Sequence, residues 1–207
     1  MAVTASSIIN RVRTQLSDNG TTQRWSDAEL LNWLSDGQRA IVVADATASQ
    51  TVTTVPLAAG TRQALPSGAH KLIHIYRNLS VSGTPGKACS YVPLSLLDNQ
   101  YPDWHTDTAV AAVRHWTYDE NDPVGFYVYP RNDGTGRLEV NYAIVPTDLA
   151  STSSTISVRD IYQTALFDYV MFRAHSKDSD YAAGQSLAAG YLQAFTNFVI
   201  AQAKGPK

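Results

Sequence analysis

Six acidic residues in the middle of the sequence are the side chains best suited to chemistry. They are Asp98, Asp103, Asp107, Asp119, Glu120 and Asp122, and Arg114 is the only arginine or lysine among them. Paired carboxylates can bind divalent metals or act as acid and base in hydrolysis, although this spacing fits no calcium-loop template. Three interpretations stay open: a solvated acidic loop, a negative surface that repels DNA, or a hydrolase site, which needs a cleft and a raised carboxylate pKa.

Histidine and cysteine form no pattern typical of a catalytic or metal site. His70 and His74 lie on a predicted strand, where they are about two pleats apart on one face and too distant to chelate a metal easily. Cys89 lies in a loop of Gly, Pro and Ser, and we interpret it as an ordinary, partly buried cysteine. A single cysteine excludes an internal disulfide and a zinc ribbon.

The motifs of nucleotide-binding and hydrolytic enzymes are also missing from the sequence. Gly86-Lys87 has Val81 where a phosphate-binding loop needs its first glycine, and Ala88 where that loop needs Ser or Thr to hold magnesium. No Gly-x-Ser-x-Gly elbow occurs. We therefore expect a protein that is not an enzyme, with no catalytic residue, no cofactor and no metal site.

A helix near the C-terminal end has charged residues within an apolar sequence. Asp168 and Arg173 point about 140° apart around it, so they cannot pair within the helix, and each needs a partner elsewhere in the fold or on another chain. Phe167 and Met171 lie within about 40° of each other at 100° per residue. We predict that Phe167, Met171, Asp168 and Arg173 contribute to an interface between subunits.

The elements that must position these residues are helical at both ends of the sequence. Apolar spacing predicts a first helix over 6–16 and a second from Ser26 to about Ala46. Ser26 and Glu29 have the spacing of a capping box, and Trp25 precedes the cap. Gly37 is on a face of small residues that lets another helix approach closely. Two further helices are predicted over 158–175, capped by Ser157, and over 181–203.

The residues between Thr51 and Pro146 have the alternation of β-strands. Eight of the nine prolines lie here, and proline is excluded from helix interiors. The clearest strands are 125–129 and 137–145, which flank a turn signal at 132–136 and predict a hairpin. One short helix is predicted over 93–99. The predicted fold class is α+β: a four-helix bundle built from both chain ends (1–49 and 156–207), with an inserted, mainly antiparallel β domain (50–155).

Composition limits the classes of partner. The chain has 207 residues, of which 16% are charged, with a net charge of -2 and a pI near 6.2, which excludes a basic nucleic-acid clamp. Serine and threonine together outnumber the charged residues, and such a surface repels its neighbours weakly, as in an assembly subunit. No secretory signal and no membrane-spanning stretch occur, so we expect a protein made in a cytoplasm, with no membrane partner.

Four segments resemble one known family, the head–tail adaptor proteins of short-tailed phages, similar to the tail tubular protein A and portal adaptor group. The resemblance covers about 11–198, and the order of the segments carries it more than any one alone. The segments are Arg24 to Trp33, Gly60 to Pro66, Tyr101 to His105, and Asp160 to Val170 with its continuation Arg173 to Asp178.

The resemblance implies a structural virion protein of the phage neck, made in the bacterial host cytoplasm. Such adaptors form a ring, typically dodecameric, with the helical part docked on the portal protein, the β part facing the tail nozzle protein, and genomic double-stranded DNA passing non-specifically through the channel before ejection. The six acids would then face the channel. Another neck connector, such as a head-completion or tail-terminator protein, is the alternative, and a virion-associated hydrolase using 98–122 is a further one.

The C-terminal residues Lys204-Gly205-Pro206-Lys207 follow the last apolar stripe and contain no acid. Gly and Pro end the helix, and a free tail of this kind is normally disordered. In the family that the sequence resembles, adaptor tails can order along the portal. We therefore predict that 203–207 docks on the portal through Lys204 and Lys207.

Overall fold

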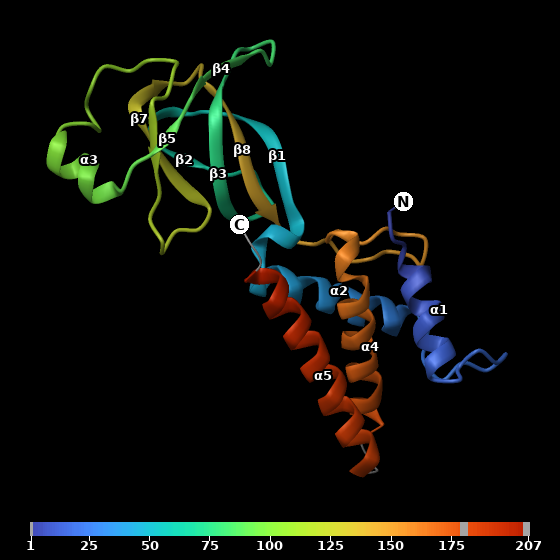
Figure 1. The fold of residues 1–207 in the computed structure, drawn as a ribbon. Helices are drawn as coiled ribbons and strands as arrows, with labels where there is room; N and C mark the ends of the chain where they lie inside the picture. The colour runs from blue at the N-terminus through green and yellow to red at the C-terminus, as the bar shows by residue number, and fades with distance from the viewer. Residues whose placement is uncertain (1, 179–181, 205–207) are drawn as a thin grey trace. The chain divides into compact units, whose positions relative to one another are not determined.

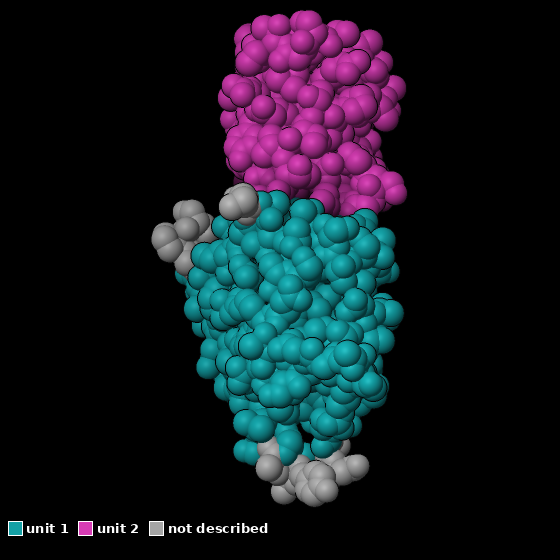
Figure 2. Space-filling view, turned by 90° about the vertical axis from the view of Figure 1, so that its right-hand side faces the viewer, with its two compact units in different colours: residues 1–49, 145–207 teal, residues 50–144 magenta. Residues whose placement is uncertain are grey.

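The structure is a computed structural model that describes residues 2–178 and 182–204. The chain divides into two compact units, shown in teal and magenta in Figure 2. The helical unit comprises residues 1–49 and 145–207, and the β unit comprises residues 50–144. Among the described residues, no helix is long and apolar enough to cross a membrane. Each unit has its own hydrophobic core and is described separately.

Four helices build the helical unit, two from each end of the chain. They are α1 (Ala5–Gln15), α2 (Asp27–Ala44), α4 (Gln163–Lys177) and α5 (Ala182–Ala203), with short 3-10 turns η1 (Ala46–Ser49) and η2 (Asp160–Tyr162). Helix α4 packs against each of the other three. In Figure 1, α4 and α5 run side by side while α2 lies across them. The origin of the helices agrees with the prediction, but an aligned four-helix bundle is not confirmed.

Helix α2 begins where the capping signal predicted. Ser26 accepts a hydrogen bond from the Glu29 backbone N–H at 3.2 Å, which satisfies one free amide of the first turn. A Cβ added to Gly37 would lie 3.0 Å from the Tyr169 ring and 3.1 Å from Leu166 of α4. The missing side chain therefore lets α2 and α4 approach, as the small-residue face predicted.

The return from the β unit differs from the sequence prediction in two ways. The helical unit resumes at Val145, whereas we expected 156, because Leu149 and Ile156 are buried in the helical core. The predicted helix start at Val158 is also wrong, since residues 156–159 are irregular and the first helical turn, η2, begins at Asp160. The backbone of this segment is satisfied elsewhere: the Arg159 N–H donates to the Ala48 carbonyl at 3.0 Å.

Two four-stranded sheets form the β unit. One has the order β1-β8-β3-β4 and the other β2-β7-β6-β5, and only the β5–β6 pair is parallel. The strands are β1 (Gln50–Pro56), β2 (Ala59–Ala64), β3 (Ala69–Leu79), β4 (Pro85–Ala88), β5 (Ser90–Tyr91), β6 (His115–Thr117), β7 (Gly125–Asp133) and β8 (Arg137–Ile144). Side chains from both sheets share one core, which includes Ile75, Phe126 and Val140. Because the other strand pairs are antiparallel, the prediction of a mainly antiparallel β domain is confirmed.

The predicted hairpin between β7 and β8 is wrong, although both strands exist. The two strands belong to different sheets and do not pair with each other. The buried Asn132 side chain accepts from the Gly134 N–H at 2.9 Å and donates to the carbonyls of Val110 and Ala111. This side chain fixes the 132–136 turn against a neighbouring loop, so the chain crosses to the other sheet instead of folding back.

The remaining predictions for the β segment hold in their main features. The short helix is α3 (Leu94–Gln100), close to the predicted 93–99, with Leu97 buried. Both His70 and His74 lie on β3, as predicted. Cys89 is buried, and burial raises the pKa of its thiol to about 11. A thiol with that pKa is protonated at neutral pH and is not an activated nucleophile.

Candidate interaction surfaces

The six acids of the central segment lie in two separate stretches of the β unit. Asp98, Asp103 and Asp107 belong to α3 and the loop that follows it, and Asp119, Glu120 and Asp122 belong to the turn before β7. Asp122 is half-buried and the other five are exposed. In the described part of the chain, no three His, Cys, Asp or Glu side chains come close enough to hold a metal ion. The acids therefore form surface, and no assembled metal site.

Asp98 helps to anchor the long loop after α3. It accepts a hydrogen bond from the Trp104 indole N–H at 3.0 Å, and the Trp104 side chain is only 1% exposed. The His105 ring stacks on Trp104 with centroids 3.8 Å apart, and its Nδ1 shares a 2.8 Å hydrogen bond with the Thr61 hydroxyl. Two of the family-like segments, 60–66 and 101–105, therefore meet through a structural contact.

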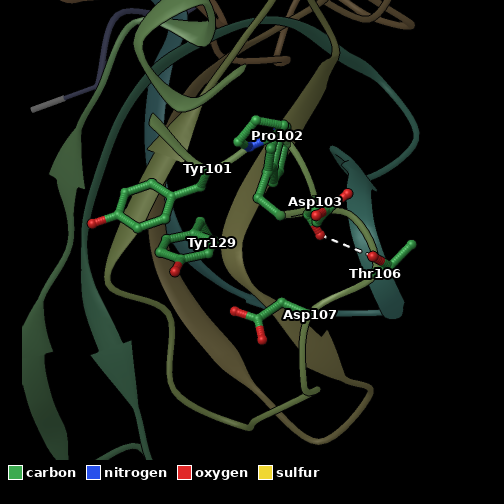
Figure 3. A pocket seen from close by; sticks show the side chains of 7 residues that line it. Tyr101, Pro102, Asp103, Thr106, Asp107 and Tyr129 are labelled. Carbon is green, nitrogen blue, oxygen red and sulfur yellow. Dashed lines mark hydrogen bonds between the residues drawn. The ribbon is translucent and has the colours of Figure 1, made fainter. Parts of the chain in front are cut away.

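A pocket of about 260 Å³ opens beside this anchor (Figure 3). Tyr101 stacks on Tyr129 on one side, with ring centroids 5.4 Å apart, and Asp103 and Asp107 line the other. Asp103 holds Thr106 through its backbone carbonyl at 3.0 Å, while Asp107 accepts from the next backbone N–H. The pocket combines exposed carboxylates with tyrosine rings, which suits contact with a positively charged side chain more than acid–base chemistry.

The second acidic stretch is a turn held by its own carboxylates. Asp119 accepts from the Asn121 backbone N–H at 2.9 Å, and Asp122 accepts from the Gly125 N–H at 3.0 Å. Asp122 also pairs with Arg62 at 3.2 Å. These are the local bonds of an ordinary turn, so the second stretch resembles the solvated-loop interpretation more than a catalytic one.

Phe167 is the apolar residue of the predicted subunit interface that remains accessible, and Asp168 and Arg173 are half-buried as well. Phe167 is half-buried on α4, with the Arg11 guanidinium 5.0 Å above its ring and the Tyr191 ring 6.4 Å away. Together with Asn10, Arg11, Thr14 and Gln15 it lines a shallow groove of about 520 Å³. The face that α1 and α4 share here is open to another chain.

Met171 does not belong to that face. Its side chain is 1% exposed and lies in the core of the helical unit, so the assignment of Met171 to a subunit contact is corrected. The sequence places it near Phe167 around the helix, but the roughly 40° of rotation that separates the two positions is enough to turn Met171 inward. Periodicity alone could not separate the two, because α4 is apolar on nearly all sides.

Arg173 has an acidic partner within the chain, and Asp168 lies near the positive charge of Arg11. Arg173 lies 3.9 Å from Asp36 of α2, with both side chains partly exposed. Burial raises the pKa of Asp168, and the nearby positive charge of Arg11 opposes that rise. Both opposite charges belong to the same chain, so neither residue needs a second subunit to meet one, and the assignment of Asp168 and Arg173 to a subunit interface stays a prediction.

A cluster around Trp25, which was not predicted from the sequence, joins two family-like segments. The Trp25 ring has Arg24 at 5.2 Å and Lys177 at 5.0 Å, and it packs on Trp33 with centroids 5.4 Å apart. Lys177 also pairs with Glu29, and Arg24 pairs with Asp178. The segments 24–33 and 173–178 therefore meet in space. Their complementary charges were the available signal.

A buried ion pair holds the loop between α1 and α2 and was also missed. Arg13 is 5% exposed and donates to Asp18 at 2.8 Å, to Asp27 at 2.6 Å and to the Trp25 carbonyl at 2.9 Å. Asp18 also accepts from the Arg24 backbone N–H at 2.7 Å. Arg13 next to the apolar Val12 was the signal in the sequence, since a charge on a buried face needs partners.

A second buried carboxylate lies at the end of α2. Asp45 accepts from the Thr47 hydroxyl at 2.6 Å and from the Tyr162 hydroxyl at 2.5 Å, with Arg159 at 3.9 Å. Burial alone would raise the pKa of Asp45, but the bonds from Thr47 and Tyr162 and the charge of Arg159 outweigh it and lower the pKa. Burial and Asp45 together raise the pKa of Tyr162 to about 12.

Helix α5 presents an outward face without charge. No Asp, Glu, Lys or Arg occurs between Ala182 and Ala203, and Leu187, Leu192 and Ile200 are exposed on its sides. Lys204 follows the helix and is exposed, with its N–H bonded to the Ile200 carbonyl at 3.1 Å. Lys207 and the rest of the predicted tail lie outside the described residues.

These features define a class of protein, a two-unit α+β protein. Its described residues form exposed surfaces and buried contacts that hold loops in place, and among them no group of side chains is arranged to hold a metal ion. Comparison with protein families gives the more specific result. Residues 3–205 match the family described as SU10 adaptor protein, so the chain belongs to that family. Comparison with curated proteins finds no matching sequence.

Family membership states the function at a coarse level. The family is one of phage adaptors, structural proteins of the virion, and it is consistent with a head–tail adaptor located in the neck and associated with portal and tail components. The match does not name the tail tubular protein A group of short-tailed phages, so that finer resemblance is not confirmed.

Proposed function

We propose that this protein forms the ring that joins the portal of a phage head to the tail nozzle, and that genomic double-stranded DNA passes through the ring. The observation that carries the proposal is the family match over residues 3–205, because it includes both compact units. The net charge of -2 supports it, since a strongly basic wall would retain the phosphates of passing DNA. The ring is dodecameric in this proposal.

Within the ring, the helical unit docks on the portal and the β unit faces the tail. The uncharged outer face of α5 favours subunit contacts through the helical unit, since it lacks the charges that keep surfaces apart. The groove at Phe167 offers a half-buried aromatic ring to the same contact, with Arg11 among its lining residues. The exposed acids of 98–122 supply the negative surface of the channel in this arrangement.

The subunit contact is tested by Phe167→Asp. Purified portal and purified adaptor are mixed, and rings on the portal are counted by electron microscopy. We expect the variant to remain a folded monomer and to lose ring formation, because a carboxylate in an apolar contact must be desolvated. Thr164→Asp, an exposed position on the same helix, is the matched control. Rings at wild-type yield, or a variant that unfolds because Phe167 is core, would both contradict the assignment.

The portal contact of the C-terminal tail is tested by deleting residues 203–207. Portal binding, measured at low salt where charge contacts are strongest, should weaken while the melting temperature of the isolated chain stays unchanged. Unchanged portal binding by the truncated chain removes Lys204 and Lys207 from the interface.

A further inference from the structure

The two sheets of the β unit end in four edge strands, and these edges differ in how they are protected. An exposed edge offers unpaired N–H and C=O groups to other chains, and proteins block it with short strands, charges, proline or bulges. Strand β4 has only the four residues Pro85–Ala88, and β5 has only Ser90–Tyr91. Strand β2 contains a register shift between Gly60 and Arg62 and a charge at Arg62.

Strand β1 has almost none of these protections. It runs for seven residues, Gln50–Pro56, in continuous register with β8, without a bulge and without a charged side chain. Val and Thr dominate it, and both favour extended backbone. Val52 is 50% exposed and lies beside the groove that Tyr76 and Glu139 also line.

The register shows which backbone groups of β1 face outward. The Leu57 N–H donates to the Gly136 carbonyl at 2.9 Å, opposite the end of the strand. In an antiparallel pair the bonded residues alternate, so Val55 and Thr53 also bond to β8, while Thr54 and Val52 point away. Pro56 fits this pattern, because its missing N–H falls on the outward side, where no ladder bond is lost.

The groups of Val52 and Thr54 have no second strand beside them in the described residues, since β1 pairs with β8 alone. We propose that this edge receives an extended segment of another virion protein, which adds to the sheet as a further strand. Main-chain hydrogen bonds would supply the affinity, and an apolar side chain of the added strand would pack on Val52.

The choice of occupant rests on the proposed ring. A head-to-tail neighbour in a ring presents a different surface of the same chain, and the three other edges that it could offer are short, bulged or charged. Pairing β1 with β1 of a second copy would close at two subunits and cannot continue around a ring. The added strand therefore comes from a different virion protein and not from a second copy of this chain. The edge of β1 carries no charge, so it fits a strand of uncharged, β-branched residues.

Hydrogen exchange tests the pairing at the level of single amides. In the free chain the amides of Val52 and Thr54 should exchange fast, and those of Thr53 and Val55 slowly. In purified virions, the peptide covering 50–56 should take up less deuterium than in the free chain. Slow exchange of Val52 and Thr54 in the dilute free chain, or equal uptake in virions, overturns the proposal. Protection that grows with concentration of the free chain assigns the edge to a second copy and overturns it too.

Substitutions separate this proposal from the proposed function. Val52→Pro removes the backbone N–H that points away from β8 and leaves the hydrogen bonds between β1 and β8 in place, and Val52→Lys adds a charge to the edge of β1. We expect both chains to fold and to lower the yield of infectious particles about tenfold or more. Val81→Lys, at a valine that is 78% exposed, is the matched control. Normal yield with both Val52 variants overturns the strand addition while the adaptor function stands. Wild-type chain missing from purified virions would instead contradict the function itself.

Discussion

The two units fix their long irregular segments by different chemistry. In the helical unit, the loop between α1 and α2 is held by a buried ion pair, with Arg13 and Asp18 both nearly inaccessible. In the β unit, the loop between α3 and β6 is held by groups other than a buried ion pair. The buried Trp104 ring donates to the exposed Asp98 carboxylate, and the Asn78 side chain both donates to Val113 O and accepts from Val113 N at 2.8 Å.

The difference predicts how each anchor fails. A buried charge that loses its partner stays buried without compensation, so the cost is electrostatic and can be relieved by removing the second charge. A buried ring that is deleted leaves a cavity, and no second substitution of a nearby charge relieves it. The aromatic anchor connects the family-like segments 60–66 and 101–105, whereas the ionic anchor connects one such segment, 24–33, to Arg13 and Asp18, which lie outside them.

The largest effect is expected at the aromatic anchor. Trp104→Ala should destabilise the β unit by about 3–5 kcal/mol, because it removes a fully buried ring and the partner of Asp98 and His105. Denaturant unfolding measures the loss, and limited proteolysis should cleave the 101–114 loop in the variant first. Tyr101→Ala, at a ring that is 50% exposed, is the control and should cost far less. Equal effects at the two positions would show that Trp104 is not the anchor.

The ionic anchor should give a somewhat smaller effect that can be reversed. Arg13→Met leaves Asp18 buried without its cation and should cost about 3 kcal/mol in unfolding free energy. The double variant Arg13→Met, Asp18→Asn should recover part of that loss, because the amide still accepts from the Arg24 N–H without carrying charge. Arg24→Met, on an exposed side chain, is the control. Additive effects in the double variant would contradict the electrostatic account.

The sequence predicted the parts of the fold that local signals determine. Ser26 and Glu29 located the start of α2, Gly37 indicated its close neighbour, and proline distribution separated the helical ends from the β middle. The pairing of strands was harder to predict from the sequence. Residues 132–136 have the composition of a hairpin turn, but the buried Asn132 directs β7 and β8 into different sheets. The Asn132 side chain bonds to the carbonyls of Val110 and Ala111, which are distant in the sequence, so a local sequence pattern cannot predict these bonds.

The candidate surfaces were predictable only in part for a similar reason. Phe167 and Met171 are equivalent in the helical pattern, yet one is accessible and the other is core, since three other helices pack around α4. Charge complementarity between 24–29 and 173–178 was present in the sequence and would have located the Trp25 cluster. The six acids stand out in the sequence as a group, and five of them are exposed, but their separation into two stretches depends on the path of the chain.

The smallest effect concerns the second buried carboxylate of the helical unit, and its pH dependence distinguishes it from a neutral anchor. Hydrogen bonds from Thr47 and Tyr162, with the charge of Arg159, lower the pKa of Asp45 from its ordinary value against the opposing effect of burial. A carboxylate with a lowered folded-state pKa stabilises the fold above its unfolded pKa, and that stability is lost as pH falls through the folded-state value.

Asp45→Asn should therefore cost about 1 kcal/mol at pH 7. Thermal melts between pH 7 and pH 3 should show the gap between wild type and variant constant down to about pH 5 and narrowing below about pH 4. Tyr162, whose pKa is raised to about 12, stays neutral throughout, so it does not contribute to the change. A gap that persists unchanged at the acidic end would mean that Asp45 acts as a neutral acceptor, and the helical unit would then be held at this point in the same way as the β unit.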